Sequence, residues 1–251
     1  MRTLLAALTL VVLTTVLGGV VIVARLLGVK DGPGTVYERL PRLWARGILG
    51  VSGIRVVIHN PERARTGEPR IYASNHVSWY DVLVLVAHLP RYSFVAKAEL
   101  FRVPVFGAAA RAIGTIPIDR ENRAAAFQSY EEAAEKIRDG RSVVVFPEGT
   151  RGRTYAVRPF KKGPFVLAIA AGVPVVPTLV HGTLEALPRG SLWLRAGRVD
   201  VHLLEPVDTA GLTYDARDAL STTVHDRLAA ELQRCYGVAS PADVRPAASA
   251  A

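Results

Sequence analysis

The residues 74 to 81 read Ser-Asn-His-Val-Ser-Trp-Tyr-Asp and directly follow a short apolar run that is typical of a strand. His76 could act as a general base, because the unperturbed pKa of a histidine side chain is about 6.5 and leaves a neutral fraction near pH 7. Asp81 could hold one ring nitrogen protonated, so that the other takes a proton from a hydroxyl group. The segment therefore indicates acid–base chemistry on a hydroxyl.

Helix geometry limits how His76 and Asp81 can pair. Residues five positions apart on a continuous helix point about 140° away from each other, so the chain must turn between them. Ser78 is suited to cap a helix that starts just after it. We expect such a turn, followed by a helix through the apolar run from Val82 to Leu89. The alternative is that this histidine and aspartate serve only packing.

Further charged residues follow other apolar runs, at places where predicted strands end. Arginine offers a planar fork of donors and lysine a point charge, so several such cations could converge on a phosphate group. The alternative for each of them is a solvated surface charge. The candidates are Arg120 after the run 114–118, the loop residues Glu148, Gly149, Thr150 and Arg151 after the run 142–146, and Lys161 with Lys162.

Short β-branched runs alternate with helical patterns beyond Gly53, which predicts an α/β fold with a single mixed sheet flanked by helices. Helical periodicity appears in Phe127, Tyr130, Ala134 and Ile137, and again in a repeat of Leu220, Val224, Leu228 and Leu232 that closes at Gly237. The predicted strands are Ile54–Ile58, Arg70–Ala73, Tyr92–Ala96, Thr115–Ile118, Ser142–Phe146, Val175–Leu179 and Val199–Leu204.

The N-terminal segment is apolar. No charged residue lies between Thr3 and Ala24, a length of about 20 residues that suffices to cross a bilayer. A cleaved signal peptide is the main alternative, although no convincing cleavage site precedes Arg25. We therefore expect residues 1–25 to form a membrane anchor helix, residues 53–238 the catalytic domain, and the Ala- and Pro-rich residues 239–251 a disordered tail.

Cations follow the apolar segment and only Arg2 precedes it, which by the positive-inside rule places the body on the cytoplasmic face of a cell inner membrane. Apolar and basic residues then interleave between Thr35 and Leu49, and this pattern predicts that residues 26–52 contain an amphipathic helix at the membrane interface. An ordinary surface helix packed on the body is the alternative. The residues concerned are Tyr37, Leu40, Leu43, Trp44 and Ile48 with Arg39, Arg42 and Arg46.

The composition narrows the classes of function. A chain of 251 residues holds one sizeable domain, and 31 Lys and Arg against 22 Asp and Glu give a net charge of +9. Such a surplus favours anionic partners, whether lipid headgroups, phosphorylated small molecules or nucleic acid. The single cysteine, Cys235, excludes an intrachain disulfide and any cysteine-rich metal site.

Four blocks together resemble the glycerolipid acyltransferase family, and within it the bacterial 1-acylglycerol-3-phosphate acyltransferases. Their order and approximate spacing match those of the family, and the resemblance extends from about Arg70 to Gly182. The blocks are Asn75-His76-x-Ser78-x-x-Asp81, Gly114 to Arg120, Phe146 to Arg151, and Val175-Val176-Pro177. Thr178 and Gly152 depart from the commoner residues at their positions.

The resemblance implies an enzyme that transfers a fatty acyl group from acyl-CoA or acyl carrier protein to lysophosphatidic acid at an anionic lipid bilayer. His76 would deprotonate the acceptor hydroxyl and Asp81 would orient it. No metal, cofactor or nucleic acid is implied. Residues expected to bind substrate are Asn75, Ser78, Arg120, Glu148, Gly149, Thr150, Arg151, Lys161 and Lys162.

Three alternatives remain open at this point. The same chemistry could use another acceptor, such as lyso-ornithine lipid or another lysophospholipid. A Ser-His-Asp hydrolase lacks the G-x-S-x-G elbow it would need, and a non-enzymatic membrane-binding module would not need an oriented His-Asp pair. We expect oxyanion donors among the backbone N–H groups of residues 75–77, and packing or surface roles for His59, His88, His181, His202 and His225.

Overall fold

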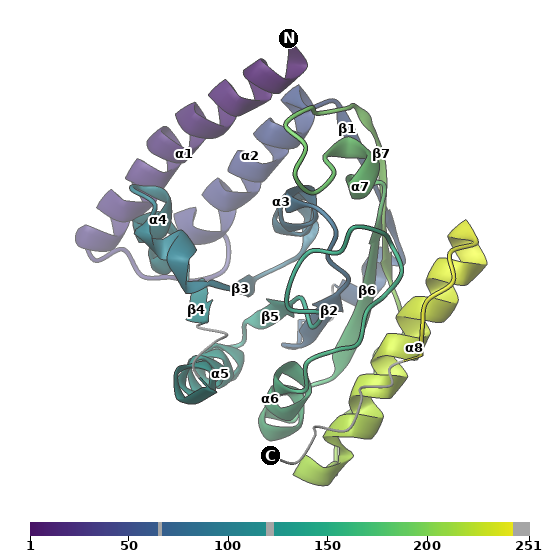
Figure 1. Ribbon diagram of the computed structural model, residues 1–251. Coiled ribbons are helices and arrows are strands. Elements are labelled where there is room, and N and C mark those ends of the chain that lie inside the picture. Colours follow the sequence, from purple (N-terminus) through teal and green to yellow (C-terminus); the bar gives the residue numbers. More distant parts are fainter. Residues whose placement is uncertain (65–66, 119–122, 243–251) are drawn as a thin grey trace.

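The computed structural model describes residues 1–64, 67–118 and 123–242, leaving aside the side chains of 123–129 and 131 (Figure 1). One mixed sheet of seven strands runs through this part of the chain in the order β1-β7-β6-β2-β5-β3-β4. All neighbouring strands are parallel except β6 and β7, which pair antiparallel. The strands are β1 Ile54–His59, β2 Ile71–Ser74, β3 Tyr92–Lys97, β4 Ile116–Ile118, β5 Ser142–Val145, β6 Val175–His181 and β7 Gly197–Leu203.

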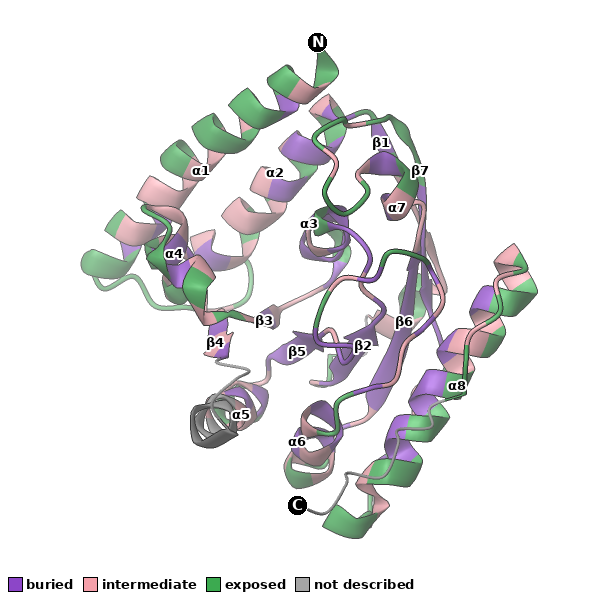
Figure 2. Ribbon diagram, viewed as in Figure 1, coloured by how far each residue is buried: buried purple, intermediate pink, exposed green. Residues whose placement is uncertain are grey.

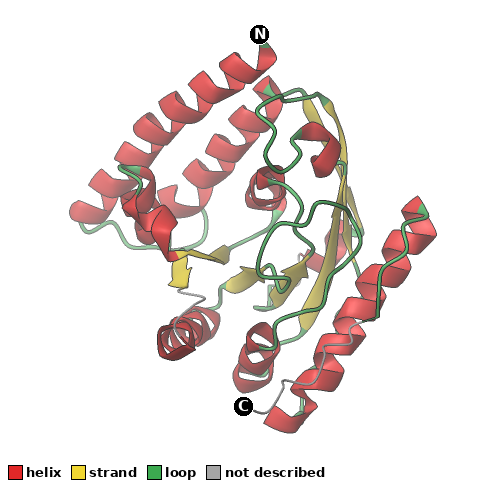
Figure 3. Cartoon of the chain, in the orientation of Figure 1, coloured by secondary structure: helices red, strands yellow, loops and turns green. Residues whose placement is uncertain are grey.

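Helices cover both faces of the sheet (Figure 3). One core lies between the sheet and the helices α5 (Arg123–Arg138), α6 (Gly163–Ala171) and α8 (Arg217–Tyr236). The other core lies between the opposite face and the helices α2 (Val36–Val51), α3 (Trp79–His88) and α7 (Thr183–Ala186). Each strand of the sheet's centre is buried on both faces, which explains the continuous apolar runs in the sequence.

The predicted α/β architecture is confirmed. All seven predicted strands are present, with ends that differ by no more than two residues. Helix α8 turns the repeat of Leu220, Val224, Leu228 and Leu232 toward the sheet and ends at Gly237, which adopts the left-handed conformation. Tyr130, Ala134 and Ile137 of α5 also face the core, whereas the side chain of Phe127 lies outside the described residues.

The apolar face of helix α2 packs on protein, which was the alternative to contact with the membrane interface. Tyr37 and Ile48 on its apolar face are buried in protein, and only Leu43 is well exposed. Its cations also contact protein, since Arg42 donates to the backbone oxygen of Leu89 at 3.0 Å and Arg46 to that of Ala87 at 3.2 Å. These carbonyls end helix α3, where positive charge is favourable. The apolar stripe of α2 is therefore a packing surface.

Helix α1 (Arg2–Leu26) packs along α2 and also against α4 (Phe106–Ala112), as Figure 1 shows. Trp44 of α2 donates its indole N–H to the hydroxyl of Thr14 at 2.9 Å, midway along α1. Within the described residues, α1 is the one helix long and apolar enough to cross a membrane. Its outer side is exposed (Figure 2) and carries Leu4, Leu5, Leu8, Val11, Val12, Val16, Val20 and Val23.

The remaining elements are short connections. They are η1 (Pro61–Ala64), η2 (Ala98–Arg102) and η3 (Tyr214–Ala216). At the C-terminal end, Ser240 accepts a hydrogen bond from the backbone N–H of Val157 at 2.9 Å, so the expected disordered tail begins with an ordered contact. Residues 243–251 of that tail lie outside the described part of the chain.

Candidate active site

The chain turns sharply between β2 and α3, which brings His76 and Asp81 together. Ser78 is the N-cap of α3, and its hydroxyl accepts the N–H of Tyr80 at 3.3 Å. Asp81 completes a capping box because its carboxylate accepts the backbone N–H of Ser78. The turn that the pairing requires is thus produced by a helix cap in which Asp81 itself takes part.

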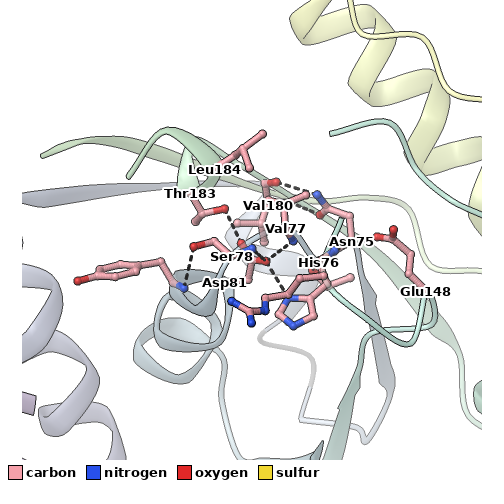
Figure 4. A network of polar contacts seen from close by, with 12 residues as sticks. Asn75, His76, Val77, Ser78, Asp81, Glu148, Val180, Thr183 and Leu184 are labelled. Atoms are coloured by element: carbon pink, nitrogen blue, oxygen red, sulfur yellow. Dashed lines mark hydrogen bonds and ion pairs between the residues drawn. The ribbon is translucent and has the colours of Figure 1, made fainter. Parts of the chain in front are cut away.

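The carboxylate of Asp81 is fully buried and has a partner for each oxygen (Figure 4). Oδ2 accepts from the ring Nδ1 of His76 at 2.8 Å and from the backbone N–H groups of Val77 at 2.7 Å and Ser78 at 2.9 Å. Oδ1 accepts the hydroxyl of Thr183, at the start of α7. Four donors therefore fix this carboxylate and compensate for its lost hydration.

Hydrogen bonding assigns the protons of the His76 ring. An ionised carboxylate can only accept a hydrogen bond, so the Nδ1 of His76 carries a hydrogen and donates to Asp81. The Nε2 of the ring is then left with a lone pair. The ring stacks on Phe146, with ring centroids 4.0 Å apart and planes 18° apart. Packing on one side and a hydrogen bond at Nδ1 hold the imidazole in one orientation. His76 also lines a large cavity.

Glu148 supports the His76 backbone from the loop after β5. Its Oε1 accepts the N–H of His76 at 2.9 Å, and its Oε2 accepts the Nε–H of Arg158 at 2.8 Å. Burial raises the pKa of the Glu148 carboxyl, although the hydrogen bond from Arg158 and that from the His76 backbone act in the opposite direction. Glu148 thus connects the loop to the turn that carries His76.

The loop that begins at Pro147 is held in a compact conformation. Gly149 has φ +81°, and a Cβ added there would lie 2.8 Å from the Cε of Lys161. The guanidinium of Arg158 donates to the hydroxyl and the carbonyl of Thr150. Gly149 therefore permits both the left-handed turn and the close approach of Lys161.

A cavity of about 650 Å³ opens beside His76. Its inner walls are apolar and come from α1, α2, α3, α4, β3 and η2, with Val21, Trp44, Val86, Phe101 and Phe106 among them. His76, Thr150, Arg151, Lys161 and Arg189 line its polar end. The cavity thus joins a basic site to an apolar channel of a size that suits a lipid chain.

The polar end of the cavity carries an excess of positive charge. Among the described residues, Arg151, Lys161 and Arg189 form no ion pair with a carboxylate, whereas Lys97 pairs with the exposed Glu99 at 2.7 Å. Burial lowers the pKa of Arg151, and the nearby charge of Arg189 lowers it further. An anionic ligand would relieve this repulsion. Arg120, another of the expected cations, lies outside the described residues.

Five expected substrate-binding residues do not line the cavity: Asn75, Ser78 and Lys162, and also Glu148 and Gly149, whose contacts hold the loop after β5. Asn75 is fully buried, and its amide group exchanges two hydrogen bonds with the backbone of Val180, at 2.9 and 2.7 Å. Ser78 is fully buried and donates to the carbonyl of Leu187 at 2.8 Å. Lys162 pairs with Asp218 at 2.6 Å and does not line the cavity. The first two shape the turn around His76.

Two of the three expected oxyanion donors already have partners in the structure. The backbone N–H of His76 donates to Glu148, and that of Val77 donates to Asp81. Both groups therefore already have buried partners and are not free to bind a developing oxyanion.

Two of the other histidines belong to a structural cluster away from the active site. His59 contacts Asp200 at 2.6 Å, and His202 contacts Glu231 at 3.2 Å and the hydroxyl of Tyr236 at 2.8 Å. Arg198 and Arg234 neutralise the two carboxylates. The cluster, which includes Cys235 as a donor to Glu231, is a satisfied network that links α8 to β1 and β7.

Four contributors to the site were not identified from sequence. Thr183 lies 102 positions after Asp81, and Arg158 and Arg189 occur in loops with no recognisable pattern. Only Lys97 had a usable signal, because it ends a strand that runs parallel to the strand before the Glu148 loop. Carboxyl ends of parallel strands meet at one edge of a sheet.

These features define a class of protein. An α/β sheet presents an oriented His-Asp pair at the carboxyl end of a central parallel strand, with its free ring nitrogen beside a cavity that is basic at one end and apolar at the other. Such a site suits base-assisted chemistry on an amphipathic, anionic substrate.

Comparison with known proteins identifies the family. The family model described as Acyltransferase matches residues 55–181. A 1-acyl-sn-glycerol-3-phosphate acyltransferase from Haemophilus influenzae is 33% identical over 186 residues, which are 73% of this chain and 76% of that protein. The chain belongs to the acyltransferase family.

Other relatives are longer than the segment they share with this chain. The chloroplastic 1-acyl-sn-glycerol-3-phosphate acyltransferase BAT2 of Brassica napus is 37% identical over 140 residues, or 55% of this chain and 41% of that protein.

The crystal structure of the 1-acyl-sn-glycerophosphate (LPA) acyltransferase PlsC from Thermotoga maritima superposes with a TM-score of 0.76 at 23% identity, covering 94% of this chain and 98% of that one. This similarity concerns the fold.

Proposed function

We propose that this chain is a 1-acyl-sn-glycerol-3-phosphate acyltransferase. It transfers a fatty acyl group from acyl-CoA or acyl carrier protein to the sn-2 hydroxyl of lysophosphatidic acid, and the product is phosphatidic acid. One observation carries the proposal: the free Nε2 of His76, set by its bond to Asp81, lies at the junction of a basic pocket and an apolar channel. The names of the Haemophilus influenzae and human relatives support it.

His76 acts as the general base of the reaction. Its Nε2 removes the proton of the acceptor hydroxyl as the oxygen attacks the thioester carbonyl, and the resulting imidazolium is stabilised by Asp81. The tetrahedral intermediate then collapses with cleavage of the C–S bond. The departing thiolate takes the proton from His76, so the ester and the free thiol form while the base returns to its neutral state.

The cations at the polar end of the cavity bind the acceptor phosphate. Arg151 and Arg189 lie next to each other, since Arg189 donates to the carbonyl of Arg151 at 2.9 Å, and Lys161 lines the same pocket. Their uncompensated charge matches a phosphomonoester. The resemblance to the family adds Arg120 to this group. The apolar walls of the cavity accommodate a hydrocarbon chain.

The chain works at a membrane surface. The outer side of α1 exposes a continuous series of Leu and Val side chains, and α1 also contributes Thr14, Leu17 and Val21 to the cavity wall. A bilayer in contact with α1 therefore lies beside the channel through which a lipid acceptor enters. The basic residues that follow α1 keep the body on the cytoplasmic side of an inner membrane.

Removing the base tests the catalytic proposal. We expect His76→Ala and Asp81→Asn to lower kcat by about 10² to 10⁴, the usual contribution of general-base catalysis. The measurement is radiolabelled acyl transfer from acyl-CoA to lysophosphatidic acid. His88→Ala, at the exposed end of the same helix α3, is the matched control and should keep wild-type turnover. Wild-type kcat in His76→Ala would contradict the mechanism.

Removing a pocket cation tests the acceptor. Arg151→Ala and Arg189→Ala should each raise the KM for lysophosphatidic acid by roughly tenfold or more, because a charge-assisted hydrogen bond contributes about 1.5 to 3 kcal/mol. The KM for a phosphate-free monoacylglycerol should not change. Arg153→Ala, exposed in the same loop as Arg151, serves as the control. Equal acylation of both acceptors by the wild type would rule out a phosphate-specific site.

A further inference from the structure

The loop between α7 and β7 exposes two large apolar side chains at its tip. Leu192 is 82% exposed and Trp193 is 76% exposed, although isolated surface Trp is uncommon. Figure 2 shows this loop largely in the colour of exposed residues, beside the N-terminal end of α1. The following residue, Leu194, is instead partly buried and packs against the core. The loop is therefore anchored at its base while its tip extends outward.

Two contacts place the loop between α1 and the active site. The backbone N–H of Leu194 donates to the hydroxyl of Thr3 at 3.1 Å, which ties the loop to the first turn of α1. At its other end, Arg189 lines the cavity and donates to the carbonyl of Arg151. The tip thus lies between the exposed apolar side of α1 and the basic end of the cavity.

The chemistry around the tip suits a lipid headgroup region. Arg189 and Arg195 flank the two apolar residues, and Trp79, 45% exposed at the cavity wall, has the guanidinium of Arg151 4.9 Å from its ring centroid. Tryptophan and arginine together are typical of membrane interfaces, where the ring is buried in the headgroup layer and the cation binds lipid phosphate. A protein partner would not explain why the tip adjoins the apolar side of α1.

We propose that Leu192 and Trp193 insert into an anionic lipid surface, as a second contact beside α1. The bilayer then covers the entrance of the cavity on two sides, so a lysolipid passes from the leaflet to His76 without crossing water. This inference rests on the proposed function, because a membrane-embedded acceptor is what gives the contact its use. It adds a membrane-binding element far from α1 in the sequence.

Vesicle binding tests the proposal on the full chain. The double variant Leu192→Ser/Trp193→Ser should partition at least about tenfold more weakly onto vesicles of phosphatidylcholine and phosphatidylglycerol. The reason is that two large apolar side chains no longer transfer their surface from water into lipid. The matched control is Leu212→Ser/Tyr214→Ser, another exposed apolar pair, which precedes α8. It should bind like the wild type.

Two further measurements separate the membrane contact from the proposed function: the depth of Trp193 in the bilayer and the turnover on two substrates. Brominated lipids should quench Trp193, a signal read as the difference between wild type and Trp193→Phe. The double variant should lose turnover on vesicle-embedded lysophosphatidic acid and keep it on a soluble short-chain analogue. Unquenched Trp193 or unchanged partitioning would overturn the membrane contact alone. Absence of turnover by the wild type on both substrates would overturn the proposed function.

Discussion

At the scale of single residues, the site consists of donors and acceptors that are almost all already satisfied. Asp81 receives four hydrogen bonds, and Glu148 receives two. The exception is the Nε2 of His76, which has no hydrogen-bond partner among the described residues and belongs to a ring that lines the cavity. A rigid set of partners around one free lone pair is the arrangement expected of a preorganised base.

Thr183 has a predicted role in positioning this base. Thr183→Val keeps the side-chain shape but removes the hydroxyl that Oδ1 of Asp81 accepts. We expect kcat to fall by roughly tenfold with little change in KM, and the free energy of unfolding to fall by about 1 to 3 kcal/mol because a buried carboxylate oxygen loses its partner. Steady-state kinetics and urea unfolding measure the two effects.

Thr183→Ser is the control for that prediction, because it restores the hydroxyl without the methyl group. It should recover most of the lost kcat. If Thr183→Val retained wild-type kcat, Asp81 would be held sufficiently by its backbone donors alone.

At the scale of elements, distant loops are fixed by single side chains. The hydroxyl of Tyr155 accepts the backbone N–H groups of Gly182 at 2.6 Å and Leu184 at 3.0 Å, and it donates to Glu185 at 2.6 Å. It thereby holds the segment at the end of β6 that carries Thr183. The path from Tyr155 to Asp81 is two hydrogen bonds long.

Tyr155→Phe should therefore affect catalysis from outside the cavity. Two backbone donors lose their acceptor, so we expect stability to fall by about 1 to 3 kcal/mol and kcat to fall with it as Thr183 moves. Leu228→Ala in α8 is the comparison, since its side chain is fully buried in the core beneath α5, α6 and α8 and does not line the cavity. This substitution should lower the free energy of unfolding by about 2 to 5 kcal/mol and leave kcat unchanged. Equal kcat in the two variants would exclude a positioning role for Tyr155.

At the scale of the whole molecule, burial makes stability depend on pH. Desolvation lowers the pKa of His181 and His202 in the folded state. The unfolded chain therefore binds more protons at these positions, so stability is full above the model-peptide value of about 6.5 and declines as the pH falls below it. The paired carboxylates of Asp200 and Glu231, whose pKa values are lowered, add a further loss only in stronger acid.

His181 provides the test of this pH dependence. Its ring stacks between Tyr155 at 4.1 Å and Tyr236 at 3.6 Å, so His181→Phe retains an aromatic ring and removes the titrating group. As the pH is lowered from about 7.5 to about 5.5, we expect the urea concentration at the midpoint of unfolding to decrease. In His181→Phe this decrease should be smaller. A wild-type midpoint that rises toward acid would contradict the assignment.

The sequence alone determined the local features of this protein. Burial of the sheet's central strands on both faces produces long apolar runs, and helix α8 produces a periodic stripe, so their positions could be predicted to within two residues. The cap at Ser78 also depends on neighbouring residues only. The His76-Asp81 pair could be proposed because both residues belong to this one short turn.

Only the tertiary structure decided which distant groups meet. Thr183, Arg158 and Arg189 contribute to the site through contacts across the fold, and Asn75 is committed to Val180 on another strand. The apolar stripe of α2 could have faced lipid or protein, since both bury the same side chains equally well. Hydrophobic periodicity in the sequence indicates that one face of a helix is buried. Which part of the molecule covers that face is determined by the packing of the complete chain.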